Sequence, residues 1–508
     1  MSKIRIPAVL SFCCVSSLLL SCRSNDLIPK SEYPEFSIVE GNTVKTRVDE
    51  YNKKVEDVDI LSPKYLIIGD TVVTYRQSKP HTPPSVTPDL SNIKNNDNPE
   101  LKGKPLRYIA VGGSLTAGVR DGGYFNEGIQ TSYPNLVARQ MGLQKFEQPL
   151  FDAADYNGFG RKVPTSVNYT GGPVPKFKEV KNNSGVLQIE KDNVTLKKYL
   201  GKPDNLAVKN FHSGNRSLLD YQFSDGNLAF DGSLSGQVLS RIYGGDLKSI
   251  SRKVFDGNFD LISFETGWQE IITWFVFKIT SAPGTQIYPE GINNLNYDNA
   301  SNLGDVIRNH GKMTFMKDLH SSGKAKYGYF LNLPLITDLP YFNIISKDEV
   351  NKVIETVNKN MVFKENVKIL PTSEIDSLLG TKVHISMKKG LSYDKPLSKY
   401  SYLTDEEQKL ITVSVEGFNK ETESLSKSFN FPVIDINSLY KQIIKGTYIT
   451  DDGVKVDGSY PKGNFFSSDA IYPTAFGQAV IANEVIKTLN NFYKMQIPLI
   501  STREYLDN

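Results

Sequence analysis

The chain has 508 residues, of which 39% are hydrophobic and 23% are charged. This balance is typical of a globular protein and excludes a disordered chain, a collagen or a coiled-coil rod. The 59 basic residues nearly cancel the 56 acidic ones, so the formal charge of +3 gives no electrostatic case for binding nucleic acid. At this length, one large decorated domain or two to three smaller domains can form.

The first residues predict export and a lipid anchor. Lys3 and Arg5 precede an apolar stretch over 6–20, which is too short to span a bilayer and has the length of a signal-peptide core. The stretch ends in Leu-Leu-Ser-Cys, which resembles the lipobox of bacterial lipoproteins with Cys22 as the diacylated residue. We expect a signal peptide over 1–21 and a lipid anchor with a short tether over 22–32. The expected location is the outer membrane, on its periplasmic or cell-surface face.

Cysteine usage agrees with a lipid anchor. The three cysteines are Cys13, Cys14 and Cys22, so removal of the signal peptide leaves one thiol, which the lipid consumes. No disulfide can form in such a mature chain, and its packed core must carry the stability of an exported protein.

The next two segments differ in composition. Residues 33–76 contain short β-like runs and predict a small β-rich module, in which Gly69-Asp70 between apolar runs indicates a hairpin. Residues 77–104 are rich in Pro, Asn, Ser and Asp, which predicts an extended linker without a core.

From 105 to 508 the sequence alternates between short apolar runs and helical spacing. The runs are apolar throughout, and helices separate them. They therefore predict an α/β fold with a central parallel sheet covered on both faces. Polar segments near 160–200 and 275–320 exceed the length of a crossover connection and predict insertions. The expected strands lie at 106–111, 205–208, 259–264, 327–333 and 431–436, and the expected helices include 133–141 and 473–493.

Four sequence blocks follow these predicted elements in a recognisable order. Gly112-Gly113-Ser114-Leu115 follows the first strand, at the carboxyl end where open parallel sheets bind ligands. The other three blocks are 204–208 followed by Gly214-Asn215-Arg216, then Gly267-Trp268-Gln269-Glu270, and Asp469-Ala470-Ile471-Tyr472-Pro473. Together the four blocks resemble the SGNH (GDSL-type) hydrolase family, in particular exported SGNH-type lipoproteins of Bacteroidota, over roughly 105–505.

The resemblance implies a three-layer α/β/α sandwich and a serine-hydrolase site. It assigns Ser114 as nucleophile, Asp469 as the acid that orients the base, and Gly214 and Gln269 as oxyanion-hole positions. The base position, however, holds Tyr472, whose phenol has an ordinary pKa of about 10 and accepts protons poorly near neutrality.

Further departures from the family pattern also argue against hydrolysis. Gln269 stands where the family has Asn, Gly113 stands beside the serine where the family has Asp, and 209–213 interrupts the second block. His212 is the best candidate for a recruited base. The alternative is that His212 is a loop histidine exposed to solvent, with no catalytic role. The other histidines, expected to be structural or solvated, are His81, His310, His320 and His384. For Asp469 we expect a cap on the last helix rather than a catalytic role.

No sequence feature indicates a cofactor. The chain has no Cys or His cluster with metal-binding spacing, no phosphate loop and no dinucleotide fingerprint, so we expect no metal and no cofactor.

Three functional hypotheses remain. The first is a non-catalytic, lipid-anchored binding or accessory subunit of an outer-membrane complex, with a β-barrel protein as the expected partner. The second is an active serine esterase or lipase with Ser114 as nucleophile and a recruited base. The third is a lectin-like module that binds glycans through Trp268 and nearby tyrosines.

Overall fold

The computed structural model places most of the predicted α/β region. The predicted signal peptide, Cys22 and the tether all lie outside the described residues, as do Gly214 and His212. Within the described part of the chain, no helix combines the length and apolarity that crossing a membrane requires. The described residues are 86–151, 158–166, 198–208, 250–265, 267–272, 318–356, 359–379 and 400–506, with short strands between 37 and 74 and between 176 and 196, and a few residues near 84, 241 and 397.

A four-stranded parallel sheet forms the centre of the fold. Its strands are β6 (Tyr108–Val111), β13 (Leu261–Phe264), β14 (Tyr327–Leu331) and β17 (Val433–Ile434), in the spatial order β17-β14-β13-β6. Leu261 of β13 lies opposite Tyr108 and Tyr327 of its two neighbours. All residues of β6 and β13 are buried, so the prediction of a parallel sheet covered by helices in an α/β fold is confirmed.

The predicted strand at 205–208 extends this sheet beyond β6 in a less regular form. The Ala110 amide donates to Asp204 O (3.0 Å), and the Leu206 amide donates to Ala110 O (2.8 Å). Only one parallel bridge, Ala110 to Asn205, meets the geometry of a ladder. Numbered along the chain, the order across the sheet is 2-1-3-4-5, which reverses direction between β6 and β13. Doubly wound sheets bind ligands at such a reversal, outside the carboxyl ends of the two strands.

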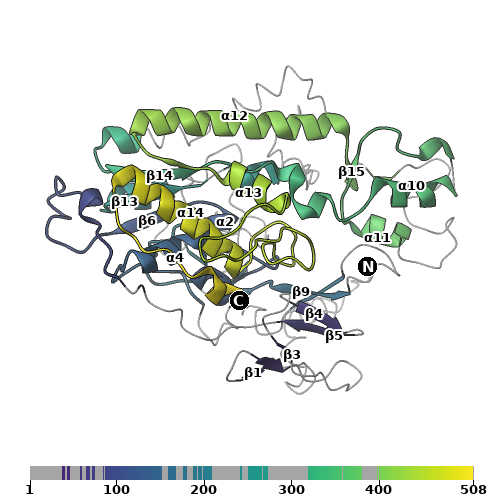
Figure 1. Cartoon of the computed structure of the whole chain (residues 1–508), viewed down its shortest axis with the longest axis horizontal. Helices are drawn as coiled ribbons and strands as arrows, with labels where there is room; N and C mark the ends of the chain where they lie inside the picture. The colour runs from purple at the N-terminus through teal and green to yellow at the C-terminus, as the bar shows by residue number, and fades with distance from the viewer. Residues whose placement is uncertain are drawn as a thin grey trace, which may run out of the picture.

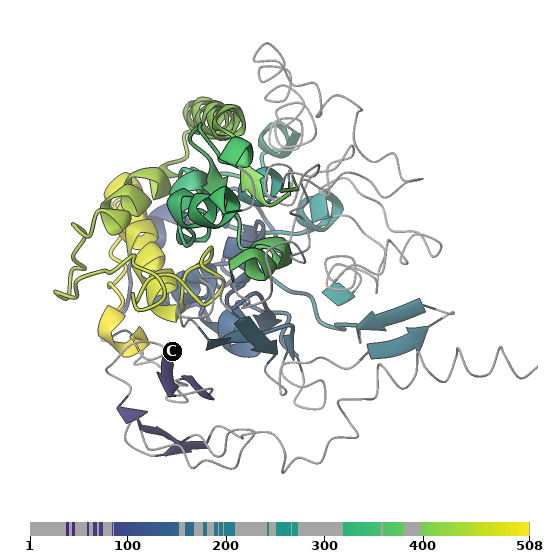
Figure 2. The ribbon, with the colours of Figure 1, turned by 90° about the vertical axis from the view of Figure 1, so that its right-hand side faces the viewer.

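Helices α12 (Asp405–Phe429) and α14 (Ala475–Tyr493) pack on the sheet, and a third helix packs on one of them. Helix α4 (Tyr133–Gln140) packs on α14, and α12 packs on β14 and β17. Figure 1 shows α14 in front of the sheet and α12 along the top, and Figure 2 shows α12 end-on above α14. A capping box of Thr404 and Glu407 begins α12, whose length was not predicted.

The last helix begins two residues later than predicted. Thr474 is its N-cap, because the Gly477 amide donates to the Thr474 hydroxyl (3.0 Å). Pro473 lies outside the helix and pairs with Phe466 in an isolated antiparallel bridge.

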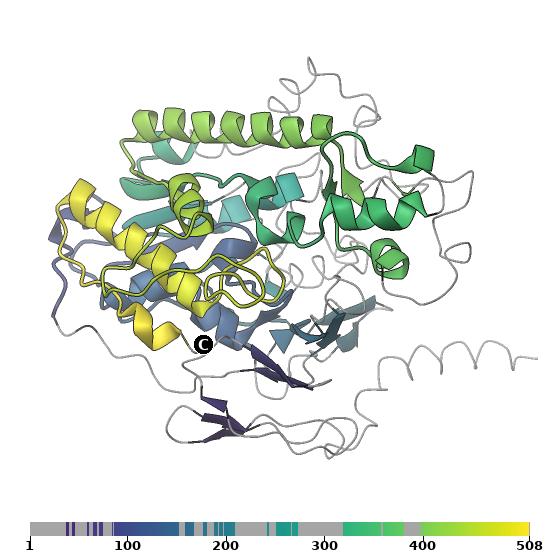
Figure 3. The same ribbon diagram turned by 45° about the vertical axis from the view of Figure 1, so that its right-hand side comes forward.

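The described residues of 344–379 and 397–403 form a lobe with a hydrophobic cluster of its own. Val350 and Ile354 of α10 (Lys347–Glu355) pack with Ile369 of β15 (Lys368–Ile369) and Ile375 of α11 (Ser373–Leu379). Figure 3 shows this lobe beyond the N-terminal end of α12. From the sequence alone this stretch is expected to belong to the main domain, and its pattern does not predict a second cluster.

Short hairpins account for most remaining strands. The predicted hairpin around Gly69-Asp70 is confirmed, since β4 (Tyr65–Ile68) pairs antiparallel with β5 (Thr71–Thr74). In the predicted insertion at 160–200, β9 pairs with β10 and β11 pairs with β12. The other elements are β1 (Ser37–Val39), β2 (Thr43–Lys45), β3 (Val58–Asp59), β7 (Tyr124–Phe125), β8 (Gly158–Phe159), β9 (Lys162–Ser166), β10 (Lys176–Glu179), β11 (Leu187–Glu190), β12 (Asn193–Leu196), β16 (Tyr402–Leu403), α2 (Ser114–Ala117), α3 (Asn126–Gln130), α6 (Ile250–Asp256), α7 (Trp268–Ile271) and α13 (Ile436–Ile444), with short 3-10 turns at Ser91–Ile93, Ile336–Asp338, Pro340–Phe342, Lys359–Met361 and Thr502–Tyr505.

The interpretation of 77–104 as a linker without a core is wrong for 86–104. Ile93 is fully buried in the main core. The buried carboxylate of Asp260, directly before β13, accepts from the backbone amides of Asn95 and Arg107 (both 2.8 Å) and pairs with Lys94 Nζ (3.2 Å). Composition favoured an extended segment, but backbone hydrogen bonds and one apolar anchor attach it to the amino-terminal end of the sheet.

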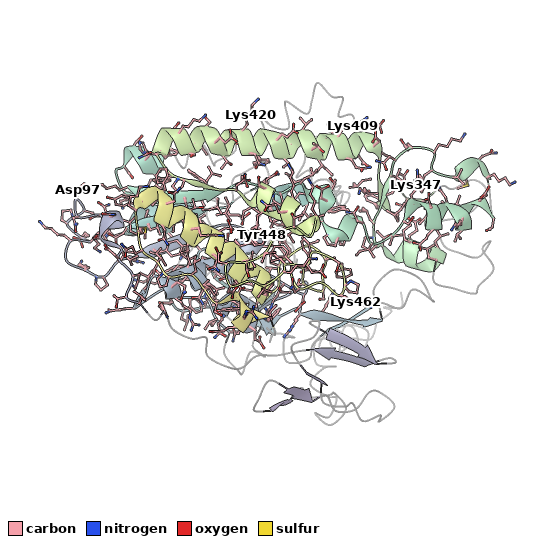
Figure 4. The ribbon with its side chains drawn as sticks, viewed as in Figure 1. Asp97, Lys347, Lys409, Lys420, Tyr448 and Lys462 are labelled. Atoms are coloured by element: carbon pink, nitrogen blue, oxygen red, sulfur yellow. The ribbon has the colours of Figure 1, made fainter. Side chains whose placement is uncertain are left out.

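Replacing Asp260 by Ala tests this attachment. We expect a loss of about 3 kcal/mol in the free energy of unfolding, because two backbone amides and a lysine lose their acceptor. Urea unfolding measures the loss, and limited proteolysis should show new cleavage within 86–104. Asp97→Ala is the control, since Asp97 pairs with Lys326 at the periphery of the molecule and should leave stability unchanged (Figure 4). Equal stability of both variants would contradict the attachment.

Candidate functional site

Ser114 lies where the sequence predicts it, at the carboxyl end of β6. The strand ends at Val111, Gly112 and Gly113 form the turn, and Ser114 begins α2 with 2% of its surface exposed. A Cβ added at Gly112 would lie 2.3 Å from Thr116 Oγ1, so the turn requires glycine at that position. The tight turn therefore places Ser114 at the carboxyl end of β6, beside the reversal in strand order between β6 and β13.

A second buried residue at this turn is Glu265, which the sequence analysis did not identify. It directly follows β13 and is 1% exposed. Its Oε2 accepts from the Gly113 amide (2.9 Å) and from the Thr116 hydroxyl (3.1 Å). Thr116 also contacts the Tyr133 hydroxyl (2.9 Å) on α4. In the sequence, the feature that points to Glu265 is its position as a charged residue directly after an apolar strand, at the carboxyl end where parallel sheets bind ligands.

Asp469 is bonded to backbone amides. Its Oδ1 accepts from the amides of Ile471 (2.9 Å) and Tyr472 (2.8 Å), and its Oδ2 accepts from the Gly122 amide (3.0 Å). Burial raises the pKa of this carboxyl and nearby Asp121 adds to the rise, while the three amide bonds oppose it. The expectation that Asp469 caps the last helix is wrong, because its short side chain reaches only its own turn and the facing loop, and Thr474 provides the cap.

Tyr472 packs as an aromatic side chain. Its ring stacks on Trp268, with the ring centroids 5.9 Å apart and an interplanar angle of 26°. Tyr440 of α13 contacts Trp268 edge to face, with the centroids 5.5 Å apart. Exposure is 7% for Tyr472 and 2% for Trp268. The lectin-like hypothesis is wrong in its use of Trp268, because a sugar stacks on an exposed ring face and this indole is buried among other rings.

Asp121 joins the loop after α2 to the loop that carries Asp469. Its backbone amide donates to Ser467 Oγ (3.0 Å), and its Oδ1 accepts from the Ser468 amide (3.0 Å). Its Oδ2 pairs with Arg161 Nε (3.2 Å). Burial alone would raise the pKa of Asp121, but Arg161 and Arg120 hold it below its ordinary value. The positive φ of 52° at Asp121 is a conformation that Asp tolerates better than most residues.

The remaining predicted positions are only partly described. Gln269 belongs to the first turn of α7, but its side chain lies outside the described part, as do Gly214 and His212. The oxyanion-hole assignment therefore stays a prediction. Among the described residues the only histidine is His320, whose exposed ring packs on Phe429 at a centroid distance of 4.7 Å.

The described residues contain no group of three or more His, Cys, Asp or Glu side chains arranged to hold a metal ion.

The sequence matches no protein-family model, and neither a curated protein nor a solved structure matches the chain.

Asp121 gives the site a defined pH dependence. Because its folded-state pKa lies below the ordinary value of 3.8, its charge contributes stability that is present above that value. This contribution is lost as the pH falls through the lower folded-state pKa. We expect the wild type to exceed Asp121→Asn by about 2 kcal/mol in the free energy of unfolding at neutral pH. Urea unfolding should show the difference shrinking in buffers well below pH 3.8. A difference that does not change with pH would contradict the role of the charge.

Proposed function

We propose that this protein is a lipid-anchored outer-membrane protein with a non-catalytic, SGNH-like α/β domain. In this proposal the domain has the three-layer α/β/α architecture of that family but no longer hydrolyses esters. It serves instead as a binding or accessory subunit of an outer-membrane complex. The strand order 2-1-3-4-5 and the position of Ser114 after β6 support the family assignment.

One observation carries the loss of hydrolysis. Both oxygens of Asp469 accept from backbone amides, and the Tyr472 ring is stacked on Trp268. In a serine triad, the acid instead accepts from the ring nitrogen of a histidine, which in turn contacts the serine hydroxyl. Here the acid position stabilises a loop junction, and the base position holds a tyrosine whose ring packs within an aromatic cluster.

The membrane assignment rests on the lipobox-like sequence ending at Cys22. Because 86–104 packs on the domain, most of the predicted linker does not act as a free tether. In the proposal, the domain therefore acts close to the membrane surface, where an integral β-barrel protein is the partner that a lipid-anchored accessory subunit meets.

A fluorophosphonate probe tests the chemistry. We expect no labelling of the purified protein and no difference from Ser114→Ala, because Tyr472 stands at the base position where the family has histidine. Circular dichroism before labelling confirms that both proteins are folded. Labelling that is lost in Ser114→Ala would reject the proposal and favour the esterase hypothesis, in which Glu265 is the described carboxylate bonded to the turn that carries Ser114.

Tyr472→His is the matched variant for the same assay. It restores the family residue at the base position, but the Asp469 oxygens stay bonded to three amides, so we expect labelling to remain absent. Labelling in this variant alone would mean that the missing histidine is the only defect of the site.

The proposed partner is tested in native membranes. After gentle detergent solubilisation, we expect the protein to migrate as part of a larger complex during size-exclusion chromatography. Cys22→Ala, which removes the predicted lipid attachment, should abolish this co-migration. Recovery of the unmodified protein as a free monomer would contradict the accessory role.

A further inference from the structure

Two buried polar atoms close to the candidate site have no hydrogen-bond partner among the described residues. They are the Tyr440 hydroxyl and the Trp268 indole Nε1. Tyr440 is 1% exposed and Trp268 is 2% exposed, so neither atom reaches bulk water. Buried polar side-chain atoms nearly always have a partner, which makes two such atoms on contacting rings unusual.

The surrounding rings hold both side chains in place. Tyr440 packs edge to face on Trp268 and on Phe465, with centroid distances of 5.5 Å and 5.1 Å. The opposite contact of Trp268 is the stacked ring of Tyr472. Neither side chain can rotate its polar atom into solvent without breaking these contacts.

The electrostatic surroundings define which ligand atom fits. Burial raises the pKa of Tyr440 well above its ordinary value, and nearby Tyr472, Asp469 and Glu265 raise it further. The phenol is therefore protonated, and the indole N–H is a donor only. Two neighbouring carboxyl groups disfavour an anionic ligand, so the complementary atom is an uncharged acceptor.

We propose that the Tyr440 hydroxyl and the Trp268 indole N–H belong to a buried subsite that binds neutral oxygen atoms. The oxygen comes from an ordered water or from a hydroxyl or carbonyl group of an uncharged ligand. This subsite does not depend on whether Ser114 is reactive, because neither donor is part of a serine triad.

Tyr440→Phe tests the subsite through stability. If the hydroxyl is bonded to a held oxygen, its removal should lower the equilibrium constant for folding about fivefold, as measured by urea unfolding. Tyr329→Phe provides the scale, since it removes a buried hydroxyl that is bonded to the Tyr108 hydroxyl (2.7 Å). A Tyr440→Phe protein as stable as the wild type, or more stable, would overturn the proposal, because removing an unsatisfied hydroxyl costs nothing.

A second measurement distinguishes the two sources of oxygen. The chain has two tryptophans, so Trp274→Phe leaves Trp268 as the only indole reporter. If the oxygen belongs to an exchangeable ligand, acetamide, a small neutral carbonyl compound, should shift the Trp268 emission, and Tyr440→Phe should reduce that shift. A stability loss in Tyr440→Phe without an acetamide shift assigns the oxygen to a held water. Failure of the proposed function would appear in fluorophosphonate labelling of Ser114, which neither measurement uses.

Discussion

A buried carboxylate at the end of β13 organises the candidate site. Glu265 accepts from the Gly113 amide and the Thr116 hydroxyl, and it thereby joins the central strand to the turn that carries Ser114. Burying a carboxylate is expensive unless hydrogen bonds compensate it, so this turn and the end of β13 are constrained to meet in one geometry. The position of Ser114 and the packing of α2 against α4 follow from that meeting.

The same strand has a buried acid at its other end. Asp260 directly precedes β13 and holds the segment 86–104 through the amides of Asn95 and Arg107. The two acids thus lie at opposite ends of β13. Asp260 binds the N-terminal segment, and Glu265 binds the turn that carries Ser114. Because successive parallel strands place their carboxyl ends together, this arrangement separates the attachment of the N-terminal segment from the candidate site.

A further pair of acids holds together two loops near the candidate site. Asp121 and Asp469 both accept from backbone amides of the opposite loop, and Arg161 balances the charge of Asp121. A triad acid must keep an oxygen directed at its histidine, whereas Asp469 has both oxygens on amides. Tyr472, three residues after Asp469, packs by stacking its ring on Trp268.

The sequence by itself determined the α/β class, because five apolar runs separated by helical spacing are best buried as a parallel sheet between helices. It also located Ser114 at the end of the first strand and the hairpin at Gly69-Asp70, since turn chemistry is local. Tertiary structure decided the roles of the acids: Glu265 and Gly113 are 152 residues apart, and Asp469 and Gly122 are 347 apart. Local pattern does not encode such partners, because they are brought together only when the sheet assembles.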